Sequence, residues 1–154
     1  MHYTNTGSSS IKRAGMDGSS PTTLVSGLNT PWGIAIDFKT SRIFWAHHIA
    51  HKIESSNLEG RDREVVVQLP SDVCPSGMAV ANGSIYWGEQ ISKKLQSSTM
   101  DGNDVITLHT DAHYLWGITL VPDLYLPQNR TNHCARHSCS KVCALTRNSS
   151  RCLT

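Results

Sequence analysis

A repeat with a spacing of 42 residues limits how this chain can fold more than any other feature of its sequence. An aromatic residue occurs at Tyr3, Trp45 and Trp87, and an acidic residue followed by glycine closes each copy. These closing dipeptides are Asp17-Gly18, Glu59-Gly60 and Asp101-Gly102. After each copy comes a related segment: PWGIAI at 31–36, PSGMAV at 75–80 and LWGITL at 115–120. A repeated unit of this size cannot bury its apolar face alone, so the sequence predicts similar units stacked on one another.

Each repeat predicts four short β-strands. In the central copy they are TPWGIAID (30–37), SRIFWAH (41–47), HKIESSN (51–57) and REVVVQL (63–69). Four strands in a repeat of roughly 40 residues are typical of a β-propeller blade, with aromatic residues packed between neighbouring blades. We assign that packing role to Tyr3, Trp45 and Trp87. Three strands from the first copy, four from each of the next two and one more in WGITLV give about three blades.

Charge and hydropathy exclude several classes of partner. The formal net charge is +2 with both signs scattered, which predicts no nucleic-acid partner. No window approaches 18 consecutive apolar residues, so we expect no direct membrane insertion by this chain. The first twenty residues lack the apolar segment of a signal peptide, and we therefore expect the chain to carry no export signal of its own.

The cysteines and the glycosylation motifs nevertheless indicate an extracellular protein. Four of the five cysteines lie within the C-terminal segment 134–152. Their spacing lacks the pairs of common zinc sites, so the segment favours disulfide bonds. Three Asn-x-Ser/Thr motifs, at Asn82, Asn129 and Asn148, predict glycans in a secretory compartment. Cys74 stands apart; we expect a buried thiol, with an intermolecular disulfide or a partner in sequence outside this chain as alternatives.

The repeat resembles a known family. FWAH (44–47) and YWGE (86–89) occupy the place of the YWTD motif in low-density-lipoprotein-receptor class B repeats, and HYTN (2–5) is a third copy. The resemblance covers residues 1 to about 122 and implies an all-β, six-bladed propeller, of which this chain encodes about three blades. The remaining blades would come from missing sequence or from a second chain that closes the ring. No copy keeps the full motif, because Asn5, His47 and Glu89 replace the Asp that helps tie one blade to the next in the family.

The C-terminal segment carries a second resemblance. NHCARHSCSKVCAL (132–145) is similar to the first half of an EGF-like module, which follows the propeller in this receptor family. The similarity implies the disulfides Cys134–Cys143 and Cys139–Cys152. We therefore expect a partial propeller at 1–122, a linker at 123–131 and a partial, disulfide-rich EGF-like module at 132–154.

The family resemblance implies a function in protein binding. We expect an extracellular protein-ligand-binding module of a low-density-lipoprotein-receptor-related receptor, endocytic or of the Wnt-type signalling kind, without a cofactor. The expected ligand contacts on one propeller face are Trp32, His47, His48, Glu89 and Trp116. For the two tryptophans, however, the burial habits of aromatic residues favour packing between blades over ligand contact. Alternative functions are an architectural spacer in a large ectodomain, or a metal-dependent propeller hydrolase with Asp37 as an acidic ligand.

Three histidines follow the second aromatic motif, in the stretch RIFWAHHIAH (42–51). His47, His48 and His51 admit three interpretations: a metal site, a pH sensor, or a solvated loop. The aligned loops hold Thr6 and Ser9 in one copy and Gln90 and Lys93 in the other. Because neither aligned loop contains an imidazole, a metal site is not a property of the repeat.

Overall fold

The structure is a computed structural model that describes residues 1–112, 115–119, 142–146 and 149–153. The described residues form β-strands and turns and contain no helix. The strands are β1 (His2–Asn5), β2 (Ser10–Arg13), β3 (Thr22–Val25), β4 (Pro31–Asp37), β5 (Arg42–His47), β6 (Lys52–Asn57), β7 (Glu64–Gln68), β8 (Pro75–Ala81), β9 (Ser84–Glu89), β10 (Leu95–Thr99), β11 (Ile106–His109), β12 (Val142–Thr146) and β13 (Ser149–Leu153).

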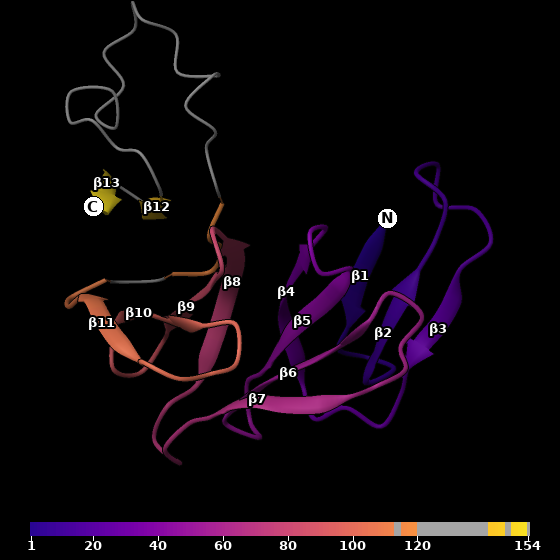
Figure 1. Cartoon of the computed structure of the whole chain (residues 1–154), viewed down its shortest axis with the longest axis horizontal. Coiled ribbons are helices and arrows are strands. Elements are labelled where there is room, and N and C mark those ends of the chain that lie inside the picture. The colour runs from indigo at the N-terminus through magenta and orange to yellow at the C-terminus, as the bar shows by residue number, and fades with distance from the viewer. Residues whose placement is uncertain (113–114, 120–141, 147–148, 154) are drawn as a thin grey trace, which may run out of the picture.

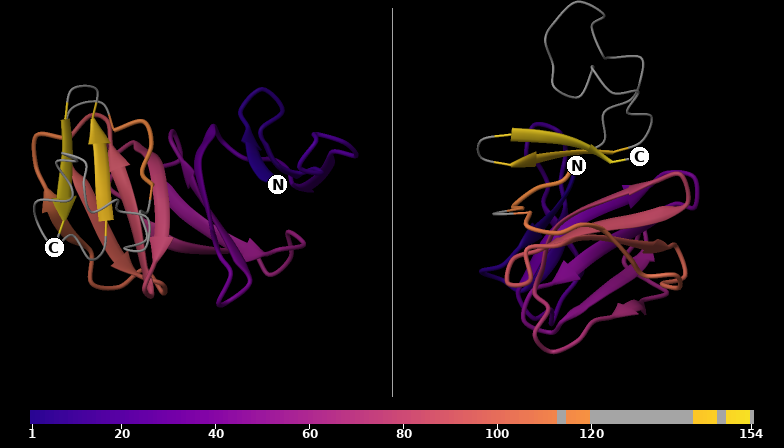
Figure 2. Two further views of the ribbon diagram at one scale, coloured as in Figure 1. Left: turned by 90° about the horizontal axis from the view of Figure 1, so that it is seen from above. Right: turned by 90° about the vertical axis from the view of Figure 1, so that its left-hand side faces the viewer.

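Three antiparallel sheets follow the repeats in chain order. They have the strand orders β1-β2-β3, β4-β5-β6-β7 and β11-β10-β9-β8. Figures 1 and 2 show them side by side, from the indigo first sheet through the magenta second sheet to the orange end of the third. In the central copy each predicted strand agrees with the observed one to within a residue at either end. Each sheet is one blade, and the prediction of a partial all-β propeller is confirmed.

The repeat extends to the backbone of the turns. Ser9, His51 and Lys93, which are 42 residues apart, all have a left-handed backbone, with φ of 48°, 51° and 53°. Ser9 and His51 directly precede β2 and β6, and Lys93 lies two residues before the equivalent strand β10. Histidine tolerates this conformation less readily than glycine but is found there. His51 therefore occupies a turn position that all three copies share.

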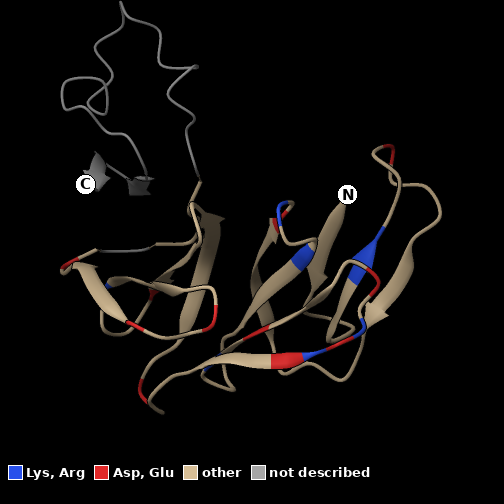
Figure 3. Ribbon diagram, in the orientation of Figure 1, with Lys and Arg blue, Asp and Glu red and all other residues tan. Residues whose placement is uncertain are grey.

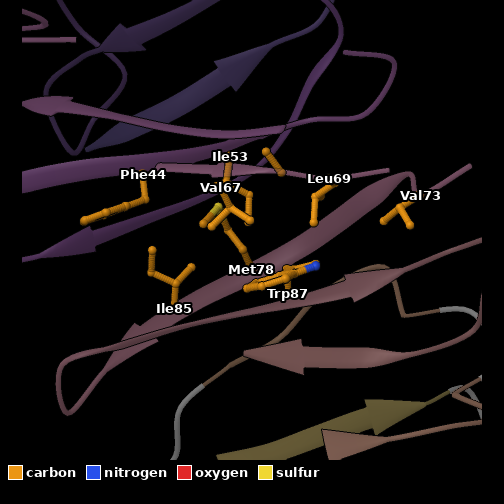
Figure 4. Close-up of a cluster of buried hydrophobic side chains, with 9 residues drawn as sticks. Phe44, Ile53, Val67, Leu69, Val73, Met78, Ile85 and Trp87 are labelled. Carbon is orange, nitrogen blue, oxygen red and sulfur yellow. The ribbon is translucent and has the colours of Figure 1, made fainter. Parts of the chain in front are cut away.

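The core lies between the blades. Trp45 packs with Ile11 and Val25 of the first blade, whereas Trp87 packs with Phe44 and Ile53 of the second. Both indoles are fully buried, with 0% of their surface exposed. Figure 4 shows Trp87 beneath side chains that come from the neighbouring sheet. Each tryptophan thus covers the blade before its own, which is why an aromatic residue recurs at this position. Tyr3, the first copy of the motif, is half-buried.

The acidic-glycine turns also contact the preceding blade. Gly60 and Gly102 have φ of +79° and +83°, a conformation that favours glycine. A Cβ on Gly102 would lie 2.8 Å from the carbonyl carbon of Val66 in β7, and closer still to its oxygen. A Cβ on Gly60 would meet Leu24 of β3 in the same way, at 2.8 Å from its carbonyl carbon. The glycines therefore permit both the turn and the close stacking of blades.

The C-terminal segment contributes a two-stranded sheet, β12-β13, in which Cys143 lies opposite Cys152 in the strand register. The predicted linker and several predicted residues lie outside the described residues, namely Cys134, Cys139, Asn129 and Asn148. The EGF-like module and its two disulfides stay predictions.

Candidate functional site: an aromatic face of the propeller

Five apolar or aromatic side chains gather at the end of the sheets where β4 and β8 begin. We call them the aromatic face; they are Trp32, His48, Ile49, Ile91 and Trp116. Two backbone hydrogen bonds bring the β5–β6 and β9–β10 turns to this end: His48 N–H donates to Thr30 O at 3.1 Å, and Gln90 N–H donates to Cys74 O at 3.3 Å. The turns therefore lie beside the segments that lead into the inner strands.

Trp32 contacts two other rings of the aromatic face. The ring centroids of Trp32 and His48 are 3.9 Å apart with an interplanar angle of 21°, which is a stacked arrangement. The Trp116 ring lies 5.6 Å from Trp32 and is tilted by 35°. Aromatic pairs attract each other at such separations. The group is accessible to a partner, because 64% of the Trp116 surface is exposed.

Hydrogen bonds fix the backbone that carries the two indoles. Ser76 is the β8 residue equivalent to Trp32 and Trp116, and its buried hydroxyl lies 2.6 Å from Leu115 O and 3.1 Å from Gly88 O. On the other inner strand, the Thr4 hydroxyl donates to Trp32 O at 2.8 Å. Since the backbone before each ring is anchored to a neighbouring strand, the indole pair is held in place before any ligand binds.

The structure separates the two interpretations of these tryptophans. Trp116 projects into solvent and does not pack between blades, and Trp32 is half-buried against His48. Ile49 and Ile91, which the sequence did not indicate, are 54% and 65% exposed in the β5–β6 and β9–β10 turns at the same end of the sheets. Both are aliphatic residues within a turn of the repeat, and this is the sequence feature that could have indicated them.

His47 lies away from this face, contrary to the expectation that it belongs to an exposed loop. It is the last residue of β5 and only 1% exposed. Its Nε2 atom lies 2.8 Å from the indole nitrogen of Trp45 and 2.6 Å from Glu54 Oε2. One ring nitrogen carries either a proton or a lone pair, so it satisfies one of these partners at a time. The Asn29 N–H points at His47 Nδ1 from 3.4 Å and links the ring to the connection between the first two blades.

The Glu54 carboxylate beside His47 is buried and forms ion pairs. Glu54 accepts from Lys52 Nζ at 2.9 Å and from Arg63 Nη2 at 2.7 Å. Figure 3 shows a basic and an acidic stretch next to each other at the start of β7, which begins at Glu64 directly after Arg63. Burial raises the pKa of Glu54, but the hydrogen bonds from Lys52 and Arg63 outweigh it and bring the pKa below its ordinary value. Burial lowers the pKa of His47, and the Glu54 carboxylate offsets this effect only in part. At neutral pH, therefore, Glu54 is ionised and His47 is neutral.

Glu89 repeats the placement of His47 in the third blade. It is also 1% exposed, and its carboxylate accepts from the Trp87 indole N–H at 3.4 Å and from the Ser92 hydroxyl. In the first blade the equivalent Asn5 accepts from Ser8 N–H at 2.9 Å. Because His47 and Glu89 are enclosed by their own blades, neither can contact a ligand in this conformation. Of the expected ligand contacts, Trp32, His48 and Trp116 lie on the aromatic face.

The three histidines do not converge on one point. His51 Nδ1 lies 2.7 Å from Val73 O, and His48 Nδ1 lies 3.4 Å from Pro75 O, whereas His47 faces Glu54. In the described part of the chain no three His, Cys, Asp or Glu side chains form a group that fits a metal ion. The metal interpretation of RIFWAHHIAH therefore has no geometric support among these residues.

Asp37 and Cys74, which the sequence also indicated as candidates, are not part of the aromatic face. Asp37 accepts from Lys39 N–H at 3.1 Å and from the Thr40 hydroxyl at 2.6 Å, and this last bond lowers the pKa of the carboxyl. It thus closes the β4–β5 turn.

Cys74 is 9% exposed and forms no disulfide with the described residues, and burial raises the pKa of its thiol. A thiol with a raised pKa is a poor nucleophile at neutral pH.

Comparison with known proteins agrees with the blade arrangement. A nidogen/laminin complex structure contains a chain that matches with a TM-score of 0.69 and 29% identity, over 76% of this chain and 46% of that chain. The chain is a partial β-propeller whose repeats resemble the YWTD type. No family model matches it. Within the residues described, no helix has both the length and the apolar character needed to span a bilayer.

Other matches to this partial propeller are shorter or more distant. The protein cueball of Drosophila grimshawi is 39% identical over 74 residues, which are 44% of this chain and 12% of cueball. Virginiamycin B lyase from Staphylococcus aureus matches with a TM-score of 0.62 at 17% identity, over 76% of this chain and 40% of the lyase. At that identity the lyase shares the fold alone. The chain spans an eighth of cueball and less than half of either matched structure.

Proposed function

We propose that this partial propeller is an extracellular protein-ligand-binding module of a low-density-lipoprotein-receptor-related receptor, of the endocytic or the Wnt-type signalling kind. The observation that carries the proposal is Trp116, 64% exposed and in contact with Trp32 on a face whose backbone is anchored. The match to a chain in a nidogen/laminin complex, which is an assembly of proteins, supports the same interpretation.

The chemistry of the aromatic face suits a protein partner. Exposed tryptophans are enriched among the residues that dominate binding energy in protein interfaces. In the turns at the same end of the sheets, Ile49 and Ile91 add exposed aliphatic surface, and apolar surface of this kind commonly marks an interaction site. His48 stacks on Trp32 and presents an ionisable ring on that surface. A partner that inserts an apolar side chain next to Trp116 would remove both surfaces from water.

The proposal also states that the protein is extracellular and that it is not an enzyme. The cysteine-rich C-terminal segment and the exposed Asn82 motif support an extracellular site. Propellers serve binding proteins and enzymes alike, so the likeness to a lyase carries no activity to this chain. Asp37, the acidic residue considered for a metal-dependent site, is engaged in its own turn. We therefore propose a binding module and not an enzyme.

A pair of matched alanine variants tests the proposal. The secreted chain would be immobilised and used to capture secreted proteins of the same organism, with laminin included as a purified probe, and affinities measured by interferometry. We expect Trp116→Ala to weaken binding by about 30-fold, because truncating a central interface tryptophan costs about 2 kcal/mol. Phe38→Ala is the control, since Phe38 is 80% exposed in the β4–β5 turn at the opposite end of the sheet.

Two outcomes would contradict the proposal. If the chain binds no protein at micromolar concentration, the architectural spacer becomes the better interpretation. If a ligand binds but Phe38→Ala weakens it as much as Trp116→Ala does, the aromatic face is not the binding surface.

A further inference from the structure

His48 lies in the turn between β5 and β6 and contacts three separate parts of the propeller. Its backbone N–H donates to Thr30 O at 3.1 Å, in the connection that leads into β4. Its ring stacks on Trp32, with the two centroids 3.9 Å apart. Its Nδ1 atom lies 3.4 Å from Pro75 O, the first carbonyl of β8 in the next blade. The half-buried imidazole therefore joins the second blade to the third at the side of an indole of the aromatic face.

The contact between the His48 ring and the next blade belongs to a series. Thr6, which corresponds to His48 in the first copy, donates from its hydroxyl to Pro31 O at 3.1 Å, the first carbonyl of β4. In the third blade the Ser76 hydroxyl lies 2.6 Å from Leu115 O, the equivalent carbonyl of the following segment. Three successive junctions thus direct a side-chain donor at the same carbonyl of the repeat. A carbonyl only accepts, so the neutral His48 ring carries its proton on Nδ1.

His48 differs from the other two donors because it is also a flat ring. The hydroxyls of Thr6 and Ser76 offer no surface on which an indole can stack. An imidazole forms hydrogen bonds at its edge and stacks through its face, so the two contacts do not compete. Since the edge of the His48 ring is held by the third blade, its face is a fixed support for Trp32.

Trp32 needs such a support because it carries the contact between the two indoles. The rings of Trp32 and Trp116 are 5.6 Å apart and tilted by 35°. Trp32 is half-buried, and its side chain could adopt other staggered rotamers if nothing packed on its ring. The orientation of Trp32 therefore decides whether the aromatic face presents a pair of indoles or two separate ones.

We propose that His48 is the positioning residue of the aromatic face. Its stacked ring and its hydrogen bond to Pro75 O hold Trp32 in the orientation in which its indole meets that of Trp116. This role is additional to the ligand contact expected from the sequence, because His48 acts here through Trp32. Its importance for ligand recognition rests on the proposed function, whereas its effect on Trp32 does not.

Circular dichroism of the indole pair tests the proposal without a ligand. Two indoles in a fixed mutual orientation couple their ultraviolet transitions and give a pair of bands of opposite sign. Trp45 and Trp87 are fully buried in separate clusters, so the part of the signal that Trp116→Phe removes belongs to the aromatic face. We expect His48→Ala to lose most of that part while the urea midpoint shows that the variant is folded.

His51→Ala is the matched control. His51 is the other half-buried imidazole of the same turn, and its Nδ1 atom lies 2.7 Å from Val73 O. Among the described residues its ring contacts neither indole, so His51→Ala should keep the paired bands although it removes a shorter hydrogen bond. Full retention of the bands in His48→Ala, or an equal loss in His51→Ala, overturns the proposal.

Two conservative variants separate the two contacts of His48. His48→Phe keeps a ring that can stack but has no donor, and His48→Asn keeps a donor but has no ring. Each should recover part of the signal that His48→Ala loses, as expected of a residue that positions Trp32 in two ways. A His48→Phe variant with no more signal than His48→Ala overturns the role of stacking.

Quenching by acrylamide gives a second measurement on Trp32 alone. In a Trp116→Phe background, Trp32 is the one tryptophan of the chain that is not fully buried. His48→Ala should then raise the quenching constant about two-fold, because stacking covers one of the two faces of the indole. If His48→Ala does not fold, His48→Asn replaces it and should raise the constant in the same direction; an unchanged constant overturns the proposal. Both signals come from the free chain, so a failure to bind any protein contradicts the proposed function alone.

Discussion

Replacing Gly102 by alanine tests whether the acidic-glycine turns hold neighbouring blades together. Gly102 and Gly18 close equivalent turns and share a φ of +83°. They differ in surroundings: a Cβ on Gly18 meets nothing within 4 Å, whereas a Cβ on Gly102 lies 2.8 Å from the Val66 carbonyl carbon. Gly18→Ala thus measures the backbone cost alone, and Gly102→Ala adds the contact with the preceding blade.

The expected magnitudes follow from these distances. Alanine in a left-handed conformation costs about 1–2 kcal/mol, and the lower entropy of the unfolded chain offsets about 0.4–1 kcal/mol of this. We therefore expect Gly18→Ala to lower the free energy of unfolding by about 0.5–1 kcal/mol. Carbon atoms normally approach to about 3.5–4 Å, so Gly102→Ala forces β7 and the turn apart by about 1 Å. Overpacking of this kind adds about 1–3 kcal/mol, and the total becomes about 1.5–4 kcal/mol.

The assay is equilibrium unfolding in urea, followed by tryptophan fluorescence and by circular dichroism. We expect the midpoint of Gly102→Ala to fall well below that of Gly18→Ala, with coincident transitions for the two probes. Equal midpoints for the two variants would refute the reasoning, because the two glycines share one backbone conformation and the contact with Val66 is what distinguishes them. A midpoint for Gly18→Ala lower than that of Gly102→Ala would do the same.

Three further predictions concern the core, the buried charges and a glycan. Trp87→Ala should lower the free energy of unfolding by about 3–5 kcal/mol, because it empties a fully buried interblade position, whereas the exposed Phe38→Ala should change it by less than about 0.5 kcal/mol in the same urea assay. His47 has a lower pKa folded than unfolded, so the unfolded state binds more protons between these two values. Its contribution to stability is complete above its ordinary pKa of 6.5 and should fall on acidification, by at most about 1.4 kcal/mol per pH unit. A His47→Asn variant should lack this slope between pH 7.5 and 5.5; an unchanged slope would assign it to other groups. Asn82 should carry a glycan when the chain is secreted, and Ser84→Ala should remove that glycan from the mass spectrum while leaving the left-handed Asn82 in its turn.

The repeat made much of the fold predictable from sequence. Strand positions in the central copy, the stacking role of Trp45 and the turn at Glu59-Gly60 follow from a spacing of 42 residues together with the period of two in strands. The reason for glycine at position 60 did not follow, since a turn dipeptide says nothing of the Leu24 backbone that it approaches. That contact joins residues far apart in sequence.

The candidate site was less accessible to sequence reasoning. Trp32, Ser76 and Trp116 occupy one position of the repeat, yet Ser76 is buried and Trp116 is exposed. His47 follows the same motif as Glu89, and both proved to be enclosed, because β5 and β9 extend as far as these residues. Local pattern predicts that a residue lies at a strand end but not which neighbours cover it there.

By itself, the sequence determined the strands of the central repeat, their grouping into blades and the aromatic residues between them, because all of these depend on spacing along one chain. Only the tertiary structure decided that Trp32, His48 and Trp116 form a single face, and that Trp45 and Glu54 both lie within hydrogen-bond distance of His47 Nε2. The physical reason is the same in each case. Exposure and hydrogen bonding depend on which blade lies next to which, and a local stretch of sequence does not specify which residues of other blades will be its neighbours.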